Sequence, residues 1–107
     1  MKRGEVWWIN FDPSVGGEIR KQRPAVIVSN DKANHFLNRI QVVLLSSNVT
    51  RIYGSDALVT VNGQKSKAMA DQLTTVSKLR FVSLAGTVSS AELTNIETAI
   101  RAQLDLP

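Results

Sequence analysis

The chain has 107 residues, 43% of them hydrophobic and 21% charged, and this composition predicts one compact globular domain over residues 1–107. It contains no cysteine and a single histidine, His35, which excludes disulfides, thiolate metal sites, cysteine nucleophiles and histidine-rich metal centres. Residues 1–51 hold eight Lys and Arg against four Asp and Glu, so the net charge of +4 comes from the first half; this asymmetry suits a polyanionic partner such as nucleic acid, although a charge of this size also serves solubility alone.

The N-terminal segment predicts a strand followed by a long loop. Residues 5–11 combine aromatic and β-branched side chains with partial alternation, and Asp12-Pro13 ends the pattern. Residues 14–22 carry a glycine pair and several charges without any period, as expected of a loop, and loops of this length in small domains are often functional. Trp7 and Trp8 alternate, which predicts one core side chain and one that can face outward. We expect core or dimer packing for both rings, with stacking on a base as the alternative.

The next segments predict a rigid strand, a short helix and a buried strand. Pro24 disfavours helical backbone at Arg23, so Arg23 is expected to stand extended at the start of a strand over residues 24–29. Asn30-Asp31 can cap a short helix or turn through Phe36. Residues 39–45 are almost continuously apolar, which predicts a strand buried on both faces.

The second half predicts further short strands and one terminal helix. Strands are expected over residues 56–61 and 67–73 around an Asn62-Gly63 turn, with weaker candidates at 74–76 and 81–88 and a helical turn at 77–80. Ser89 and Glu92 have the spacing of a capping box. The helix that follows carries an apolar stripe for the core or a dimer interface, formed by Leu93, Ile96, Ile100 and Leu104.

These elements predict a mainly-β or α+β fold, a small bent antiparallel sheet or partial barrel with a C-terminal amphipathic helix. The longest apolar runs have about four residues, far short of the ~20 that cross a bilayer, so we expect a cytoplasmic protein without a membrane span.

No standard catalytic motif is present, and the candidate site consists of polar groups at strand ends. Glu18, Arg20, Lys21 and Arg23 fall within six residues, and cations beside a loop suit a phosphodiester. The alternative is a solvated charged loop with incidental ion pairs.

Several blocks in order resemble the MazF/PemK family of toxin endoribonucleases. The first runs from Arg3 to Pro13 and is followed by Gly17-Glu18 and by Gln22-Arg23-Pro24 with its strand. The later blocks are Val42-Val43-Leu44-Leu45-Ser46-Ser47-Asn48, Ala70-Asp71-Gln72 with Thr75 to Arg80, and the terminal helix. The similarity covers essentially the whole chain, and the Arg-Pro block is fairly specific in combination with Asp-Gln.

The resemblance implies an SH3-like barrel of the CcdB/PemK type that forms a homodimer. It implies metal-independent, cofactor-free cleavage of single-stranded RNA, particularly mRNA, at short recognition sequences, in a type II toxin–antitoxin system. The implied inhibitor is an acidic, partly disordered, MazE-like antitoxin.

The resemblance also assigns site residues. Arg23 falls on the family's catalytic arginine, and Ser46 on a position where the family usually has threonine, with Ser47 as a competing hydroxyl. Glu18 matches a loop acid whose role stays open. The implied RNA-binding set is Arg20, Lys21, Gln22, Ser47, Thr50, Arg51, Asp71 and Gln72.

The expected chemistry uses the 2′-OH of the RNA as nucleophile and leaves a 2′,3′-cyclic phosphate and a 5′-OH end. Two other functions remain open at this point. One is a non-catalytic toxin of the same fold that binds a protein target such as DNA gyrase, and the other is a catalytically inactive RNA-binding module.

Overall fold

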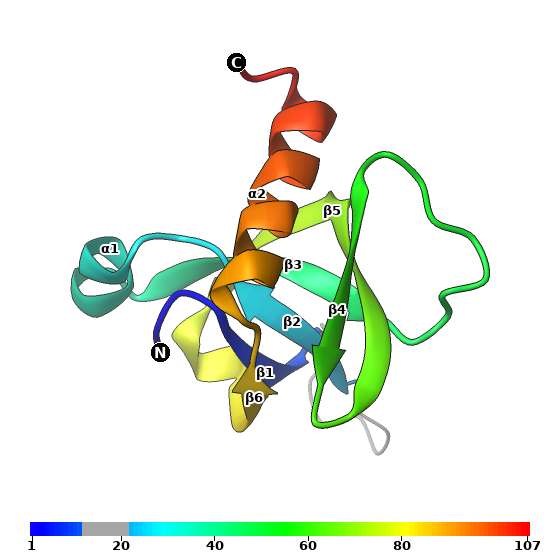
Figure 1. Ribbon diagram of the computed structural model, residues 1–107. Coiled ribbons are helices and arrows are strands. Elements are labelled where there is room, and N and C mark those ends of the chain that lie inside the picture. The colour runs from blue at the N-terminus through cyan, green and yellow to red at the C-terminus, as the bar shows by residue number, and fades with distance from the viewer. Residues whose placement is uncertain (12–21) are drawn as a thin grey trace.

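The computed structural model describes residues 1–11 and 22–107, which form six strands, two α-helices and one 3-10 turn (Figure 1). In chain order the elements are β1 (Glu5–Asn10), β2 (Gln22–Ile27), α1 (Asp31–Phe36), β3 (Arg39–Ser46), β4 (Asp56–Val61), β5 (Gln64–Ser77), η1 (Lys78–Arg80), β6 (Phe81–Thr87) and α2 (Ser90–Leu104). Within the described ranges no helix combines the length and apolar character that a membrane span requires.

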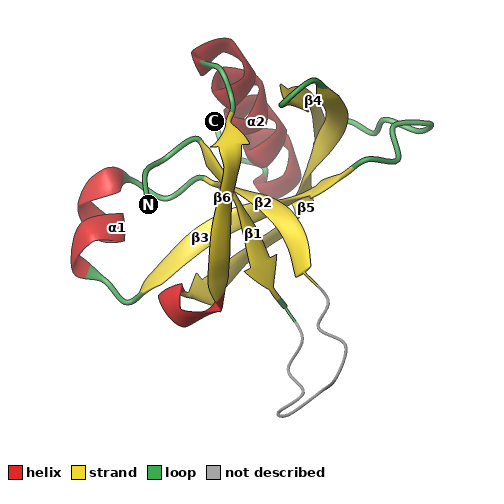
Figure 2. Ribbon diagram, turned by 90° about the horizontal axis from the view of Figure 1, so that it is seen from below, coloured by secondary structure: helices red, strands yellow, loops and turns green. Residues whose placement is uncertain are grey.

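The strands form one antiparallel sheet in the order β4-β5-β3-β2-β1-β6. The sheet curls strongly, as the crossing strands in Figure 2 show, and its two edge strands approach each other. At this closure the Asn62 side-chain amide donates a hydrogen bond to the Ala85 carbonyl, and Gly86 lies against Val61. The expected mainly-β barrel with a C-terminal helix is confirmed.

Two hydrophobic clusters cover the two faces of the central strands. Val26 contributes to the cluster that packs under α2, around Ile96, whereas its neighbours Ala25 and Ile27 contribute to the cluster on the other face. In β3 the residues from Val42 to Leu45 are all buried. The prediction of a strand buried on both faces is therefore confirmed.

The structure corrects the prediction for the strand after the hairpin. The segments predicted as strands at 67–73 and 74–76 belong to one continuous strand, β5, which lies between β4 and β3. Residues 64–69 pair with β4, and β3 pairs with residues 67–68 and again with residues 73–77. Because a bulge separates the two stretches that pair with β3, the side chains there do not alternate regularly, and the sequence pattern suggests two separate strands.

The predicted caps are present, and most other boundaries shift by one or two residues. Asn30 caps α1 by accepting from the Ala33 N–H, and Ser89 and Glu92 form the capping box of α2. In α2 the fully buried positions are Ile96 and Ala99, whereas Leu104 is half exposed. The end of the predicted helical stripe thus lies on the surface of the chain.

Candidate functional site

The ends of two neighbouring strands bring Arg23 and Ser46 to one pocket. The pairing of β2 with β3 runs from Ile27–Val42 to Ala25–Leu44, and Arg23 and Ser46 lie two residues beyond its last pair. Arg23 is exposed and Ser46 half-buried, and both line the same pocket. Each is held by its other neighbour in the sheet, because Arg23 pairs with Ile9 of β1 and Ser46 with Lys67 of β5.

A pocket of about 590 Å³ opens at this end of the sheet, and we call it the hairpin pocket because the β4–β5 turn forms one of its walls. It brings together the four predicted residues Gln22, Arg23, Ser46 and Ser47. Its other lining residues are Val6, Trp8, Pro24, Leu45, Val61, Asn62, Gln64, Ser66 and Ala85.

Arg23 also borders a second pocket of about 370 Å³, the bulge pocket, where it meets Asp71 and Gln72. The remaining lining residues of the bulge pocket are Phe11, Leu44, Leu73 and Thr74. The bulge explains the exposure of Asp71 and Gln72. Between the pairs Val43–Leu73 and Leu45–Ala68, β5 holds three more residues than β3, and the extra residues leave the ladder.

Hydrogen bonds to side chains hold the loop after β3. Ser46 Oγ accepts from the Asn48 N–H at 3.2 Å, and the Thr50 N–H and hydroxyl both donate to Asn48 Oδ1. The Arg51 carbonyl accepts from Lys67 Nζ at 2.8 Å. Thr50 and Arg51 line neither the hairpin pocket nor the bulge pocket, so the structure does not bring these two predicted residues to Arg23.

Three predicted residues, Glu18, Arg20 and Lys21, lie outside the described residues. Among residues 1–11 and 22–107 no group of three or more His, Asp or Glu side chains is arranged to hold a metal ion. The described lining of the two pockets offers one guanidinium, four hydroxyls, four side-chain amides and one carboxylate. A guanidinium beside a hydroxyl is suited to bind a phosphate and to stabilise charge that develops on it.

The structure adds residues that the sequence did not assign to the site, above all Trp8, Asn62 and Gln64. Trp8 is 40% exposed, whereas Trp7 packs edge-on against Phe81. Trp7 thus lies half-buried against a hydrophobic cluster, whereas Trp8 faces outward. The Asn62-Gly63 turn was evident from the sequence, but its position beside Ser46 depends on barrel closure.

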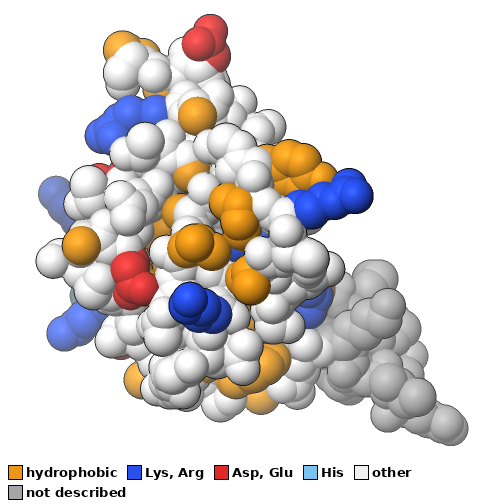
Figure 3. Space-filling model, turned by 45° about the vertical axis from the view of Figure 1, so that its right-hand side comes forward, with side chains coloured by type: hydrophobic (Ala, Val, Ile, Leu, Met, Phe, Trp, Pro, Cys, Tyr) orange, Lys and Arg blue, Asp and Glu red, His pale blue; other side chains and the backbone are white. Residues whose placement is uncertain are grey.

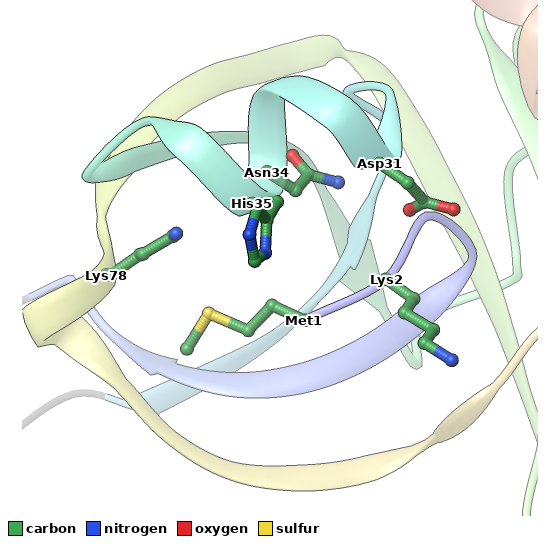
Figure 4. A pocket seen from close by; sticks show the side chains of 6 residues that line it. All are labelled: Met1, Lys2, Asp31, Asn34, His35 and Lys78. Carbon is green, nitrogen blue, oxygen red and sulfur yellow. The ribbon is translucent and has the colours of Figure 1, made fainter.

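Another polar pocket, of about 430 Å³, lies at the N-terminus between α1 and η1 (Figure 4). In it the His35 imidazole and the Lys78 ammonium point toward each other above the Met1 side chain. The buried Asn34 there is engaged by the Ser29 carbonyl, which accepts from Asn34 Nδ2 at 2.9 Å. None of the predicted site residues lines this pocket.

Comparison with known proteins identifies close relatives over the whole chain. Residues 2–104 match the family model described as PemK-like, MazF-like toxin of type II toxin-antitoxin system. Endoribonuclease MazF9 of Mycobacterium tuberculosis is 39% identical over 115 aligned positions that cover 99% of this chain and 98% of the relative. Endoribonuclease toxin MazF of Escherichia coli K12 is 32% identical over 91% of this chain and 87% of its own length.

Solved structures share the fold at lower sequence identity. An endoribonuclease in complex with its cognate antitoxin from a mycobacterial species superimposes with a TM-score of 0.85 at 23% identity, covering 100% of this chain and 97% of that one. MazF from Deinococcus radiodurans gives a TM-score of 0.81 at 19% identity, with 99% and 97% covered.

Proposed function

Because the chain belongs to the PemK-like, MazF-like toxins of type II toxin–antitoxin systems, we propose that it is an endoribonuclease that cuts single-stranded RNA at the site around Arg23. The observation that carries this proposal is that Arg23 and Ser46 line one pocket, while Arg23 also borders the pocket that holds Asp71 and Gln72. The curated relatives are endoribonucleases, which favours this function over a toxin that binds gyrase and over an inactive RNA-binding module.

The proposed reaction uses the ribose as its own source of nucleophile. The 2′-oxygen forms a bond to phosphorus while the bond from phosphorus to the 5′-oxygen breaks, which leaves a 2′,3′-cyclic phosphate and a 5′-OH end. The 2′-OH loses its proton and the departing 5′-oxygen gains one. No co-reactant is needed for this balance.

Arg23 stabilises the charge that accumulates on the equatorial phosphate oxygens. Its planar guanidinium offers paired N–H donors that match a phosphate, and a guanidinium is a poor general base. We therefore assign it an electrostatic role, with proton donation to the 5′-oxygen as the alternative role. Ser46 donates a hydrogen bond to the same phosphate or relays a proton. Ser47 lines the same pocket and is the alternative hydroxyl.

The test compares two arginines at opposite ends of the sheet. Arg23→Ala should lower kcat by roughly 10²–10³-fold or more, the usual cost of one charge-stabilising donor. Arg39→Ala is the matched control, since Arg39 is exposed at the start of β3, the end away from Ser46. It should cut as the wild type does.

The assay uses a long transcript with excess EDTA, and the 5′ ends are mapped. A single 2′-deoxy substitution at a mapped cut position should block cleavage there. Full activity of Arg23→Ala would reject the site, and cleavage of the 2′-deoxy substrate would reject the mechanism.

The family and its solved relatives support two protein partners, a second copy of the chain and an acidic MazE-like antitoxin. Figure 3 shows hydrophobic side chains gathered near the centre of the face that carries β4, with Lys and Arg around them. Exposed apolar residues of this part of the chain include Ile52, Tyr53 and Leu58. The net charge of +4 complements an acidic partner.

A substrate of cellular mRNA places the proposed activity in the cytoplasm. Sedimentation of the purified protein at micromolar concentration should give the mass of a dimer. A monomer at all concentrations would reject the proposed assembly.

A further inference from the structure

We propose that the hairpin pocket is the subsite that receives one unpaired nucleobase beside the scissile phosphate, with Trp8 and Gln64 as specificity-determining residues. This inference rests on the endoribonuclease function proposed above. It assigns a role to a cavity that the catalytic chemistry at Arg23 does not itself require.

The size and lining of the hairpin pocket fit a base. Its volume of about 590 Å³ lies in the usual range of small-ligand sites. The floor is apolar, with Val6 and Leu45, while Gln22, Asn62 and Gln64 add side-chain amides. Each amide carries both a donor and an acceptor, as the edge of a nucleobase does.

Trp8 supplies a stacking surface. Its side chain is 40% exposed, and its strand neighbours across the sheet are Pro24 and Ser83. The adjacent Trp7 is committed to the structure, because its indole N–H donates to Glu5 Oε1 and its ring packs edge-on against Phe81. Single-stranded RNA is commonly held by bases stacked on such exposed aromatic rings.

The position of the pocket ties it to the cut site. Arg23 and Ser46 form part of its lining, so a base inserted there carries its phosphate to the guanidinium. An aliphatic side chain from a protein partner would leave the amides around it without hydrogen bonds, which is costly once they are desolvated. A nucleobase satisfies them, and the observations therefore favour RNA as the occupant.

Gln64 is suited to substitution, because its side chain is exposed and, among the described residues, bonds only to the neighbouring residue of its own hairpin. Gln64 is the first residue of β5, is exposed, and its side-chain amide donates to the Lys65 carbonyl at 3.0 Å. Asn62 is less suited to a test because it has a positive φ of 51° in the turn and bonds to the Ala85 carbonyl. Gln64→Ala is therefore the main variant, with Trp8→Ala as the second.

The experiment measures coupling between these side chains and single bases. An oligoribonucleotide with a mapped cut site is prepared with one abasic ribose at each position in turn, and kcat/KM is measured. For the wild type, loss of the base that occupies the pocket should lower kcat/KM by about 10-fold or more. In Trp8→Ala and Gln64→Ala the same abasic change should lower kcat/KM by a clearly smaller factor, because each variant already lacks one of the contacts to that base.

Gln103→Ala, an amide removed from the exposed C-terminal part of α2, is the matched control and should show the full wild-type loss. If the abasic losses of both hairpin-pocket variants equal those of the wild type at every position, the subsite is wrong. Should Trp8→Ala fail to fold, Gln64→Ala alone decides.

A binding arm separates this proposal from the proposed function. Oligonucleotides with 2′-fluoro riboses lack the 2′-OH nucleophile, so binding can be measured without cleavage. A set of them covers the sequence of the same transcript, and the one that binds most tightly is made again with a single abasic position at each place in turn. If the loss of affinity at one abasic position is smaller in Trp8→Ala and Gln64→Ala than in the wild type, but ordinary RNA is not cut, the endoribonuclease is rejected and the subsite is kept.

If ordinary RNA is cut but the variants and the wild type lose the same affinity at every abasic position, the subsite is rejected and the endoribonuclease is kept. If the two variants weaken only the binding of an acidic antitoxin peptide, the occupant is a protein side chain and the nucleobase proposal is overturned.

Discussion

Gly86→Ala tests the closure of the barrel, because Gly86 lies on β6 where this strand meets the β4–β5 hairpin. A methyl group built on Gly86 would lie 2.8 Å from Val61 Cγ1 and 3.3 Å from Asn62 Oδ1, whereas ordinary contacts begin near 3.4 Å. Asn62 cannot move away freely, since its amide donates to the Ala85 carbonyl. The hairpin therefore has to shift or the strands have to separate.

Overpacking of this kind costs about 1–3 kcal/mol of unfolding free energy. For a domain of this length such a loss corresponds to a fall in Tm of roughly 5–20 °C. Gly54→Ala is the matched control, because nothing lies within 4 Å of its added methyl group and its φ is not positive. It should leave stability unchanged or raise it by up to about 1 kcal/mol, through a less flexible unfolded chain.

Both variants are measured by thermal and urea unfolding, followed by circular dichroism. Equal stability of Gly86→Ala and the wild type would show that β6 and the hairpin are not in contact as described. An equal loss in Gly54→Ala would show that the effect belongs to glycine replacement in general and not to barrel closure.

Three further changes probe the helix α2 and its contacts. Burial raises the pKa of the Glu92 carboxyl, but hydrogen bonds from the Ser89 and Thr60 N–H groups, at 2.8 and 2.7 Å, lower it more, so the net pKa lies below its ordinary value. A carboxyl whose pKa is lower in the folded state stabilises the fold at pH values above its unfolded-state pKa. That stabilisation is lost as the pH falls through its folded-state pKa. Glu92→Gln should thus cost about 1 kcal/mol at pH 7, with the difference from wild type in urea unfolding shrinking below about pH 4.5; a constant difference would contradict the assignment. Ile96→Ala should lower the free energy of unfolding by about 2–5 kcal/mol, because Ile96 lies on the face of α2 that is buried against the sheet. Asn95→Ala, on the exposed face of the same helix, should change the free energy of unfolding in urea by less than about 0.5 kcal/mol. Similar values for these last two would refute the helix orientation.

Features set by neighbouring residues could be predicted from the sequence. The capping box at Ser89 and Glu92 satisfies the first backbone N–H groups of a helix from within a few residues, and the Asn62-Gly63 turn depends on left-handed backbone that both residues adopt, with φ of 51° and 76°. Pro24 likewise determines the extended backbone of Arg23, whatever the rest of the chain does.

Features set by long-range pairing could not be predicted in this way. The continuity of β5 depends on its pairing with β4 on one side and with β3 on the other, and the bulge in its pairing with β3 exposes Asp71 and Gln72. The approach of Gln64 to Arg23 depends on the curl of the whole sheet. No local pattern indicates such distances. The expected roles of Asp71 and Gln72 came from the resemblance to a family, which gave no role to Gln64.

The candidate site contains residues held by buried strands and residues on exposed turns and bulges, and the two groups differ in how freely they can be substituted. Arg23 and Ser46 lie just beyond the paired, buried parts of β2 and β3, which end at the Ala25–Leu44 pair, and a change of register there would turn core residues to solvent. Gln64 and Asp71, by contrast, stand on a hairpin and a bulge whose side chains are exposed. On the proposals made above, substitutions there should alter what the two pockets bind at little cost in stability. The proposed cleavage chemistry is thus tied to the core, whereas the proposed base contacts lie on exposed side chains.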